Sequence, residues 1–120
     1  MARKNVLKTY KMFNSEDIST SATSGVTNTS NLDKASIYLE WTGAAPVGTI
    51  TVEATNDDPN SSSPVWKTVD FGSSIDISGA SGNHDLIFNE MPFNAIRLQY
   101  TSTSGTGTLN ATIHAKTQGA

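Results

Sequence analysis

Apolar and polar residues alternate strictly along four stretches of this sequence, at residues 37–41, 50–54, 96–100 and 109–115. In the third stretch Ile96, Leu98 and Tyr100 alternate with Arg97 and Gln99. A repeat of two residues places one apolar face against a core and one polar face in solvent, as in a half-buried β-strand. No segment combines helix caps with the repeat of 3.6 residues that an amphipathic helix needs. The pattern predicts an all-β fold, an antiparallel β-sandwich or jelly-roll-like single domain with an extended N-terminal arm.

The composition agrees with that fold class. The chain has 120 residues, the size of one domain, and no cysteine, which excludes a disulfide framework, a thiolate metal site and a thiol nucleophile. Charged residues make up 16%, fewer than the usual quarter or so, and Ser, Thr, Asn and Gly take the polar positions. No apolar run is long enough to span a bilayer, and the N-terminus lacks the apolar stretch of a signal peptide. We therefore expect no membrane partner.

Glycine-rich and polar segments separate the predicted strands. Residues 43–48 form a turn between two strands, which meet there as a hairpin or a corner. Residues 56–64 and 78–83 are predicted loops, and Asp85–Phe88 is a short strand between the second loop and a turn at 90–94. Residues 102–107 are glycine-rich and lie between two alternating runs, which predicts a terminal β-hairpin.

The N-terminal segment differs from the rest of the chain in charge. Residues 1–15 carry four basic and no acidic residues, whereas residues 16–120 carry four basic and eleven acidic residues, a net of −7. The periodicity of residues 4–13 is ambiguous, because a helix would also group Val6, Tyr10 and Phe13. Lysine on an exposed edge favours an extended arm or an edge strand. We divide the chain into a basic arm with a Ser/Thr-rich linker (1–31) and a β-sandwich body (32–120).

This arm is the predicted assembly interface. Its apolar side chains would anchor on a partner, and its lysines would pair with acidic groups there. The same lysines could contact nucleic-acid phosphates, with Tyr10 and Phe13 stacking on bases, but the acidic body opposes such binding. We favour docking on protein over nucleic acid. The predicted interface residues are Lys4, Val6, Leu7, Lys8, Tyr10, Lys11, Met12 and Phe13.

Chemistry-bearing residues are sparse. His84 is predicted in a loop and His114 on the outer face of the last strand, so we expect two exposed histidines and no catalytic pair. Asn56, Asp57, Asp58 and Asn60 offer oxygen ligands for calcium, but Asx residues also dominate ordinary turns. No nucleophile elbow or phosphate-binding loop is present. We expect no catalytic residue, no metal and no cofactor.

The two tryptophans have different predicted roles. Trp41 is in phase with Ile37 and Leu39 and therefore belongs to the core. Trp66 follows the polar loop, where an exposed aromatic ring could stack on a sugar. Together with Asp57 and Asp58, it forms a candidate contact for a glycan or an ion.

Several segments together resemble small structural proteins of tailed bacteriophages. These are Thr55-Asn56-Asp57 at the end of a strand, Trp66 after a variable loop, Arg97 and Tyr100 in a strand, and the Ser104–Leu109 segment. The resemblance covers about residues 35–116 and leaves out the arm. It implies a non-enzymatic β-sandwich that functions by assembling.

The resemblance leads to the following expectations. The protein is a virion structural protein made in the host cytoplasm, with a head decoration or minor capsid role. Its partners are other virion proteins, the major capsid protein first, and copies of itself in a homo-oligomer. The alternatives are a tail or baseplate component, or a carbohydrate-binding or receptor-binding module.

Overall fold

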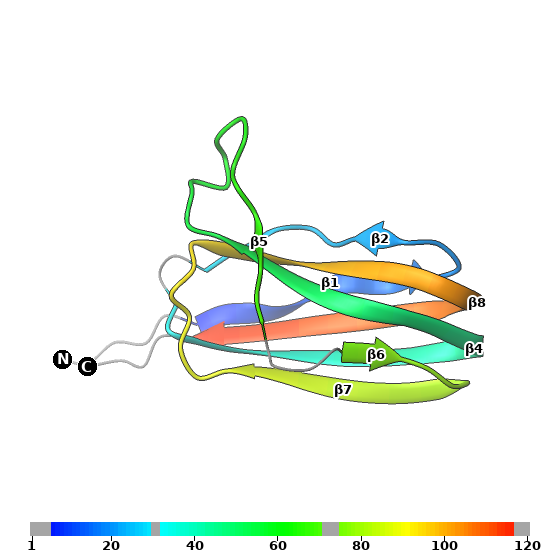
Figure 1. Ribbon diagram of the computed structural model, residues 1–120. Helices are drawn as coiled ribbons and strands as arrows, with labels where there is room; N and C mark the ends of the chain where they lie inside the picture. The colour runs from blue at the N-terminus through cyan, green and yellow to red at the C-terminus, as the bar shows by residue number, and fades with distance from the viewer. Residues whose placement is uncertain (1–5, 30–31, 71–74, 117–120) are drawn as a thin grey trace.

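All regular structure in the described residues is β-strand (Figure 1). The computed structural model describes residues 6–29, 32–70 and 75–116. The strands are β1 (Val6–Asp17), β2 (Ala22–Thr23), β3 (Thr27–Asn28), β4 (Lys34–Thr55), β5 (Lys67–Thr68), β6 (Ile75–Ile77), β7 (Ser81–Phe88) and β8 (Ala95–Lys116). Within these ranges no helix is long and apolar enough to cross a bilayer. The all-β prediction is confirmed.

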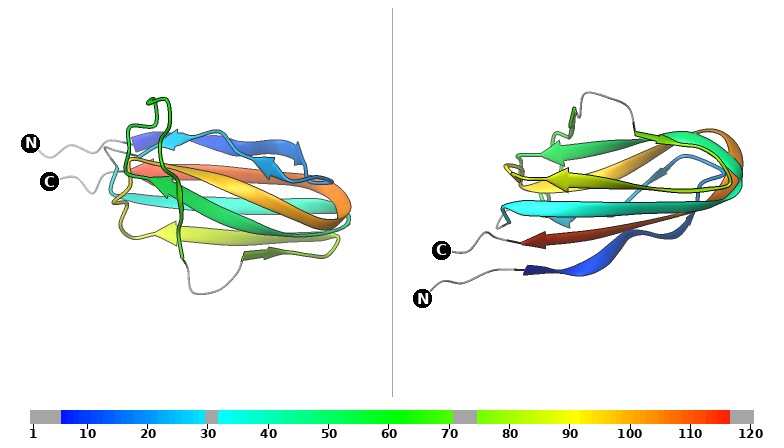
Figure 2. Two further views of the ribbon diagram at one scale, coloured as in Figure 1. Left: turned by 45° about the horizontal axis from the view of Figure 1, so that its top comes forward. Right: turned by 90° about the horizontal axis from the view of Figure 1, so that it is seen from below.

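Two long strands, β4 and β8, form the centre of the molecule. They pair antiparallel along their whole length, from Lys34 opposite Lys116 to Thr55 opposite Ala95. This two-stranded ladder bends over near its middle, so that its two halves face each other across the core (Figure 2). One half contains residues 34–43 and 107–116, and the other contains residues 48–55 and 95–102.

The remaining strands extend each half into a layer. Layer 1 has the order β1, β8 (107–116), β4 (34–43) and β7. Layer 2 has β2 and β3 beside β8 (95–102), then β4 (48–55), then β5 and β6. The chain crosses between layers from β1 to β2, from β3 to β4, within β4, from β6 to β7, from β7 to β8 and within β8. It stays in layer 2 from β2 to β3 and from the second half of β4 through β5 to β6. This is the connectivity of a jelly roll. The predicted antiparallel sandwich of jelly-roll type is confirmed.

The bend in the ladder explains the glycine-rich segments. The register between β4 and β8 shifts between Ala44 and Val47, a β-bulge that turns both strands sharply. Gly105 has φ of +79° and lies against the backbone of Ala45, so a side chain there would overlap the opposite strand. Ala45 itself has φ of +50°. Residues 43–48 therefore form a corner and not a hairpin.

The predicted terminal hairpin is wrong. Residues 102–107 do not fold Ile96–Tyr100 back onto Leu109–Ala115. Instead both halves belong to the single strand β8, and each half pairs with β4 in a different layer. The alternation was read correctly, but a glycine-rich segment can bend a continuous strand as well as close a turn.

The core lies between the two layers. It includes the completely buried Ile37, Leu39 and Ile113 from layer 1 and Leu98 and Tyr100 from layer 2. Each such side chain contributes about 1.5–3 kcal/mol relative to an exposed position. Trp41 is 7% exposed and donates from Nε1 to the backbone oxygen of Ser78 at 3.1 Å, which confirms its predicted place in the core.

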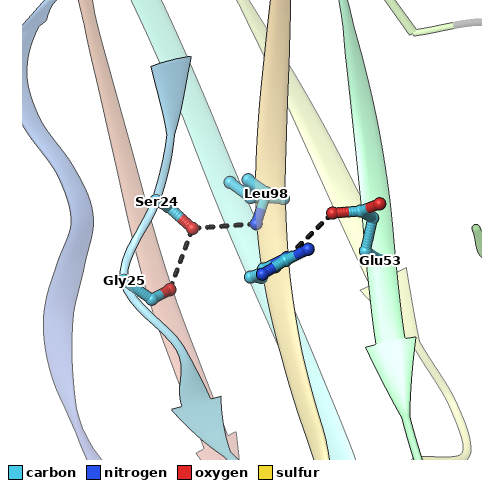
Figure 3. A network of polar contacts seen from close by, with 5 residues as sticks. Ser24, Gly25, Glu53 and Leu98 are labelled. Atoms are coloured by element: carbon cyan, nitrogen blue, oxygen red, sulfur yellow. Dashed lines mark hydrogen bonds and ion pairs between the residues drawn. The ribbon is translucent and has the colours of Figure 1, made fainter. Parts of the chain in front are cut away.

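The N-terminal segment is part of the sandwich where it is described. β1 is an edge strand of layer 1 and pairs with β8 from Val6 opposite Lys116 to Asp17 opposite Thr108. β2 and β3 pair with the other half of β8. Between β2 and β3, the Ser24 hydroxyl takes the place of a backbone acceptor for β8. It accepts from Leu98 N at 2.8 Å and donates to Gly25 O at 2.9 Å (Figure 3). The predicted boundary at residue 31 lies outside the described residues.

Candidate functional site

The loop between β4 and β5 projects from one end of layer 2 (Figure 1). At its base lies a cavity of about 380 Å³. The cavity walls include Asn56, Asp57, Val65, Val69 and Phe93. Lys67 and Asp70 also line it, so the cavity combines an apolar wall with two acidic residues and one basic residue. Of the predicted glycan or ion contacts, the structure brings Asp57 to this cavity.

The two aspartates of this loop hold its turns in place. The Asp57 carboxylate accepts from Val65 N at 2.6 Å, which ties the two ends of the loop together. The Asp58 carboxylate accepts from Asn60 N at 2.9 Å, an Asx turn. Among the described residues no group of three or more His, Asp or Glu side chains could hold a metal ion. The loop geometry accounts for both aspartates as turn-forming residues.

Trp66 lies on the outer face of layer 2, beside the cavity and not in its wall. The Arg97 guanidinium carbon is 4.2 Å from the centre of the Trp66 ring, a cation–π contact. Arg97 Nε also donates to Glu53 Oε1 at 2.8 Å, and Figure 3 shows Glu53 facing this bond from β4. One face of the indole is therefore covered by arginine. This arrangement leaves at most one ring face of Trp66 for a sugar.

The predicted assembly interface falls on β1. Met12 is 7% exposed and Phe13 is 3% exposed, so both side chains belong to the core of their own chain. The expectation that these two anchor on a partner does not fit this placement. The cause is the pairing of β1 with β8, which closes the core with these side chains.

The other predicted interface residues divide into three groups. Lys11 is exposed, and its Nζ donates to Asn110 Oδ1 at 3.2 Å. Val6, Leu7, Lys8 and Tyr10 are strand residues of β1 whose backbone alone is described. Lys4 lies outside the described residues. Of the eight predicted interface side chains, Lys11 is the one that the structure places on the surface in the described part of the chain.

Lys11 lies at the edge of the outer face of layer 1. Short polar side chains from β4, β7 and β8 cover this face, and Tyr38 and Ile87 stand out from them with 45% and 66% exposure. His114 lies on this face, as predicted, within 3.2 Å of Thr9 Oγ1. His84 is not in a loop but in β7, opposite Leu39, and thus on the other face of the layer. The two histidines do not form a pair.

Sequence reasoning missed the length of β7. It predicted a strand from Asp85, whereas β7 begins at Ser81 and pairs with β4 over eight residues. The stretch Ser81–His84 has no apolar alternation, so its sequence gives no strand signal. The consequence is an exposed edge strand that includes Asp85 and Ile87.

Comparison with known proteins shows the fold and no closer relationship. No protein-family model matches the sequence, and no curated protein matches it. A chain from a structure of infectious bursal disease virus, Gx strain, superimposes with a TM-score of 0.58 at 11% identity over 96% of this chain. The present chain spans 32% of that one, about a third of its length. The SPBc2 prophage-derived protein YomS superimposes with a TM-score of 0.51 at 12% identity, covering 95% of both chains.

Proposed function

We propose that this protein is a non-enzymatic structural component of a bacteriophage virion, with a head decoration or minor capsid role. It would act by binding other virion proteins, the major capsid protein first, and by associating with copies of itself. It would be made in the host cytoplasm and incorporated into particles there.

The observation that carries this proposal is the jelly-roll connectivity of the whole described chain. A chain from a virus and a prophage-derived protein share this fold over at least 95% of the present sequence. The phage-like pattern at Thr55–Asp57, Trp66 and Arg97–Tyr100 adds independent support. In the structure Trp66 contacts Arg97, and Asn56 is joined to the start of the same strand, because the Asn94 amide donates to Asn56 O at 2.6 Å.

The surface of layer 1 is suited to docking on a flat protein lattice. Most of its outward side chains on β4 and β8 are short and polar, such as Ser36, Thr42, Thr108 and Thr112. Tyr38 and Ile87 supply apolar contact area that a polar face otherwise lacks. Aromatic residues of this kind are enriched in protein interfaces.

The test is to locate the chain in purified particles. Particles from cells that carry the gene in its natural context are separated from free protein on a density gradient, and the chain is quantified by mass spectrometry. Dissociated heads and tails are then analysed separately. Many copies of the chain per head support a head decoration role, whereas recovery of the chain with tails supports the tail or baseplate alternative. Absence from particles of both kinds refutes the proposal.

One observation favours a second candidate, a receptor-binding or carbohydrate-binding module. The cavity at the base of the 56–66 loop is large enough for a small ligand, and its wall pairs Phe93 and Val65 with Asp57. A glycan array with the wild-type chain and Phe93→Ala tests it. Phe93→Ala opens the apolar wall and should abolish binding to any glycan held there.

A control at a distant position shows whether any lost binding is specific to the cavity, and a melting curve of Phe93→Ala shows whether this variant is folded. Val26→Ala removes an apolar side chain of similar type that is 47% exposed on the far edge of layer 2. Glycan binding that survives Val26→Ala and disappears with Phe93→Ala assigns the cavity. An array with no wild-type signal rejects this candidate and leaves the virion proposal unaffected.

A further inference from the structure

Layer 1 has two open edges, formed by β1 and β7. In the described part of the chain no strand pairs with the outer side of either one. Exposed edges usually carry bulges, lysine or proline that prevent pairing with another chain. β1 has such protection, with three register shifts along its length. β7 has none of these features: it pairs with β4 in unbroken register and contains neither lysine nor proline.

The two edges carry opposite charges at the same position along the strands. Lys11 of β1 lies opposite Thr112, Thr112 opposite Tyr38, and Tyr38 opposite Asp85 of β7. Residues that are directly opposite in a sheet share a face, so all four side chains lie in one row on the outer face. Lys11, Tyr38 and Asp85 are exposed. One row therefore ends in a lysine at one edge and an aspartate at the other.

The backbone of Asp85 also faces outward. Gly43 N donates to Ala80 O at 2.9 Å, in the register that pairs β4 with β7. Hydrogen-bonded and non-hydrogen-bonded pairs alternate along an antiparallel ladder. Counting from that bond, residues 82, 84 and 86 direct their amide and carbonyl groups to β4. Those of Asn83, Asp85 and Ile87 are directed to the open edge.

The same count applies to Lys11. Ile18 N donates to Gly107 O at 3.0 Å, in register with Glu16 opposite Leu109. Odd-numbered residues of β8 therefore bond to β1, which makes Tyr10 opposite Ile113 a hydrogen-bonded pair. Lys11, opposite Thr112, is the next residue, and its amide and carbonyl groups are directed away from β8.

We propose that copies of this chain associate head to tail, with β1 of one copy paired to β7 of the next. β1 runs antiparallel to β8, β8 to β4 and β4 to β7, so β1 is antiparallel to β7. A second copy in the same orientation thus presents β1 antiparallel to an open β7. Lys11 then lies opposite the partner's Asp85, and both have free backbone groups in phase for pairing.

This inference goes beyond the virion role, because it identifies a contact between copies that would form in solution. The opposite charges of Lys11 and Asp85 favour the pairing of β1 with β7 over a symmetric pairing of two β7 strands. A symmetric pairing would bring together two faces that each carry Asp85 and Glu40. The bulges of β1 limit the ladder to the stretch around Lys11, so the charge pair decides how strongly the copies bind. A head-to-tail contact of this kind builds rings or open filaments.

The test is a charge-reversal series measured by sedimentation velocity over a range of concentrations at low salt. The wild-type chain is expected to form larger species as its concentration rises, and these should dissociate in high salt. Lys11→Glu and Asp85→Lys each place like charges at the contact, so each variant alone should remain monomeric. An equal mixture of the two variants restores attraction at every contact and should associate again.

Two controls keep the result specific. Glu40→Lys makes the same change in net charge one row away from Asp85 on the same face and should associate like the wild type. Amide hydrogen exchange of Lys11 and Asp85 should slow as the wild-type chain associates, and not in Lys11→Glu. A chain that is monomeric at all concentrations overturns the inference. So does association that Lys11→Glu leaves unchanged, which would indicate pairing of β7 with β7.

Discussion

The contact between Gly82 and Trp41 tests whether packing against the indole excludes any side chain at residue 82. Gly82 lies opposite Trp41 in the β4–β7 pair. A Cβ atom at residue 82 would overlap Trp41 Cζ2 and lie 2.7 Å from Cε2 and 3.1 Å from Cη2. Favourable carbon contacts begin near 3.5 Å. The indole cannot easily move away, because it is buried and its Nε1 is bonded to Ser78 O.

The expected cost of Gly82→Ala follows from these distances. Forcing one extra carbon into a packed core costs about 1–3 kcal/mol. Alanine also restricts the unfolded chain, which returns about 0.4–1 kcal/mol. We expect the free energy of unfolding to fall by about 1–2 kcal/mol. With an unfolding entropy near 2.1 cal/mol/K per residue, a chain of this length should lose about 4–8 °C in Tm.

A double-mutant cycle shows whether the indole is the cause. Trp41→Leu lacks all three atoms that the new Cβ would meet, and alone it should destabilise the chain by leaving a cavity. In Gly82→Ala/Trp41→Leu the alanine methyl enters space that the indole has left. The double variant should therefore be more stable than the sum of the single effects by at least about 1 kcal/mol.

Urea unfolding followed by fluorescence and circular dichroism measures the four free energies, with the slope m checked for constancy. Gly25→Ala is the matched control, because its Cβ would have no atom within 4 Å. It should leave the free energy of unfolding unchanged or slightly raised. Additive effects of Gly82→Ala and Trp41→Leu, within about 0.5 kcal/mol, would refute the proposed clash.

Four further predictions concern single positions. Gly48→Ala should destabilise the chain more than Gly25→Ala in the same unfolding assay, because its Cβ would overlap the Tyr100 ring at the corner. Tyr100 is completely buried, and its hydroxyl has no hydrogen-bond partner among the described residues, so Tyr100→Phe should leave the free energy of unfolding unchanged or raised. Burial raises the pKa of Tyr100 above 10.0, so wild-type stability should decline as pH rises past about 10, and melting curves of Tyr100→Phe should decline less. Hydrogen bonds from the Ser19 hydroxyl and amide lower the pKa of Asp17 below 3.8. The resulting stabilisation is present at neutral pH and is lost in acid, as Asp17 becomes protonated. Ser19→Ala removes the hydroxyl and should raise the pKa of Asp17 in an NMR titration.

The strands of the central ladder could be predicted from the sequence, but not their connection. Alternation identified residues 37–41, 50–54, 96–100 and 109–115, and all of them lie in β4 or β8. What alternation could not show is that the glycine-rich stretches between them are bends. A local turn and a bend use the same residues, and the difference depends on which distant strand each half pairs with. That information is non-local, and the alternation of a single strand does not contain it.

The candidate sites were less predictable for a related reason. Met12 and Phe13 looked like exposed anchors because β1 has apolar residues on both of its possible faces. Pairing with β8 determined which residues face the core. The Asp57 carboxylate accepts from the amide of Val65, next to Trp66, but the stacking of Arg97 on Trp66 joins residues that are distant in the sequence. Residues 81–84 gave no strand signal, although they form half of the edge strand β7.

The folding of one ladder over itself explains where function can lie in this chain. β4 and β8 occupy the centre of both layers, so most of the core is built from the inward faces of two strands. Substitutions there act on stability, as the Gly48 and Tyr100 variants are expected to do, and Gly82→Ala in β7 is expected to act through Trp41 of β4. The edge strands and the 56–66 loop contribute less to the core, and their outward groups are free to contact other molecules. A jelly roll of this form can therefore change its edges and loops for a new partner while the central ladder maintains the fold, which is consistent with the same fold at 11–12% sequence identity.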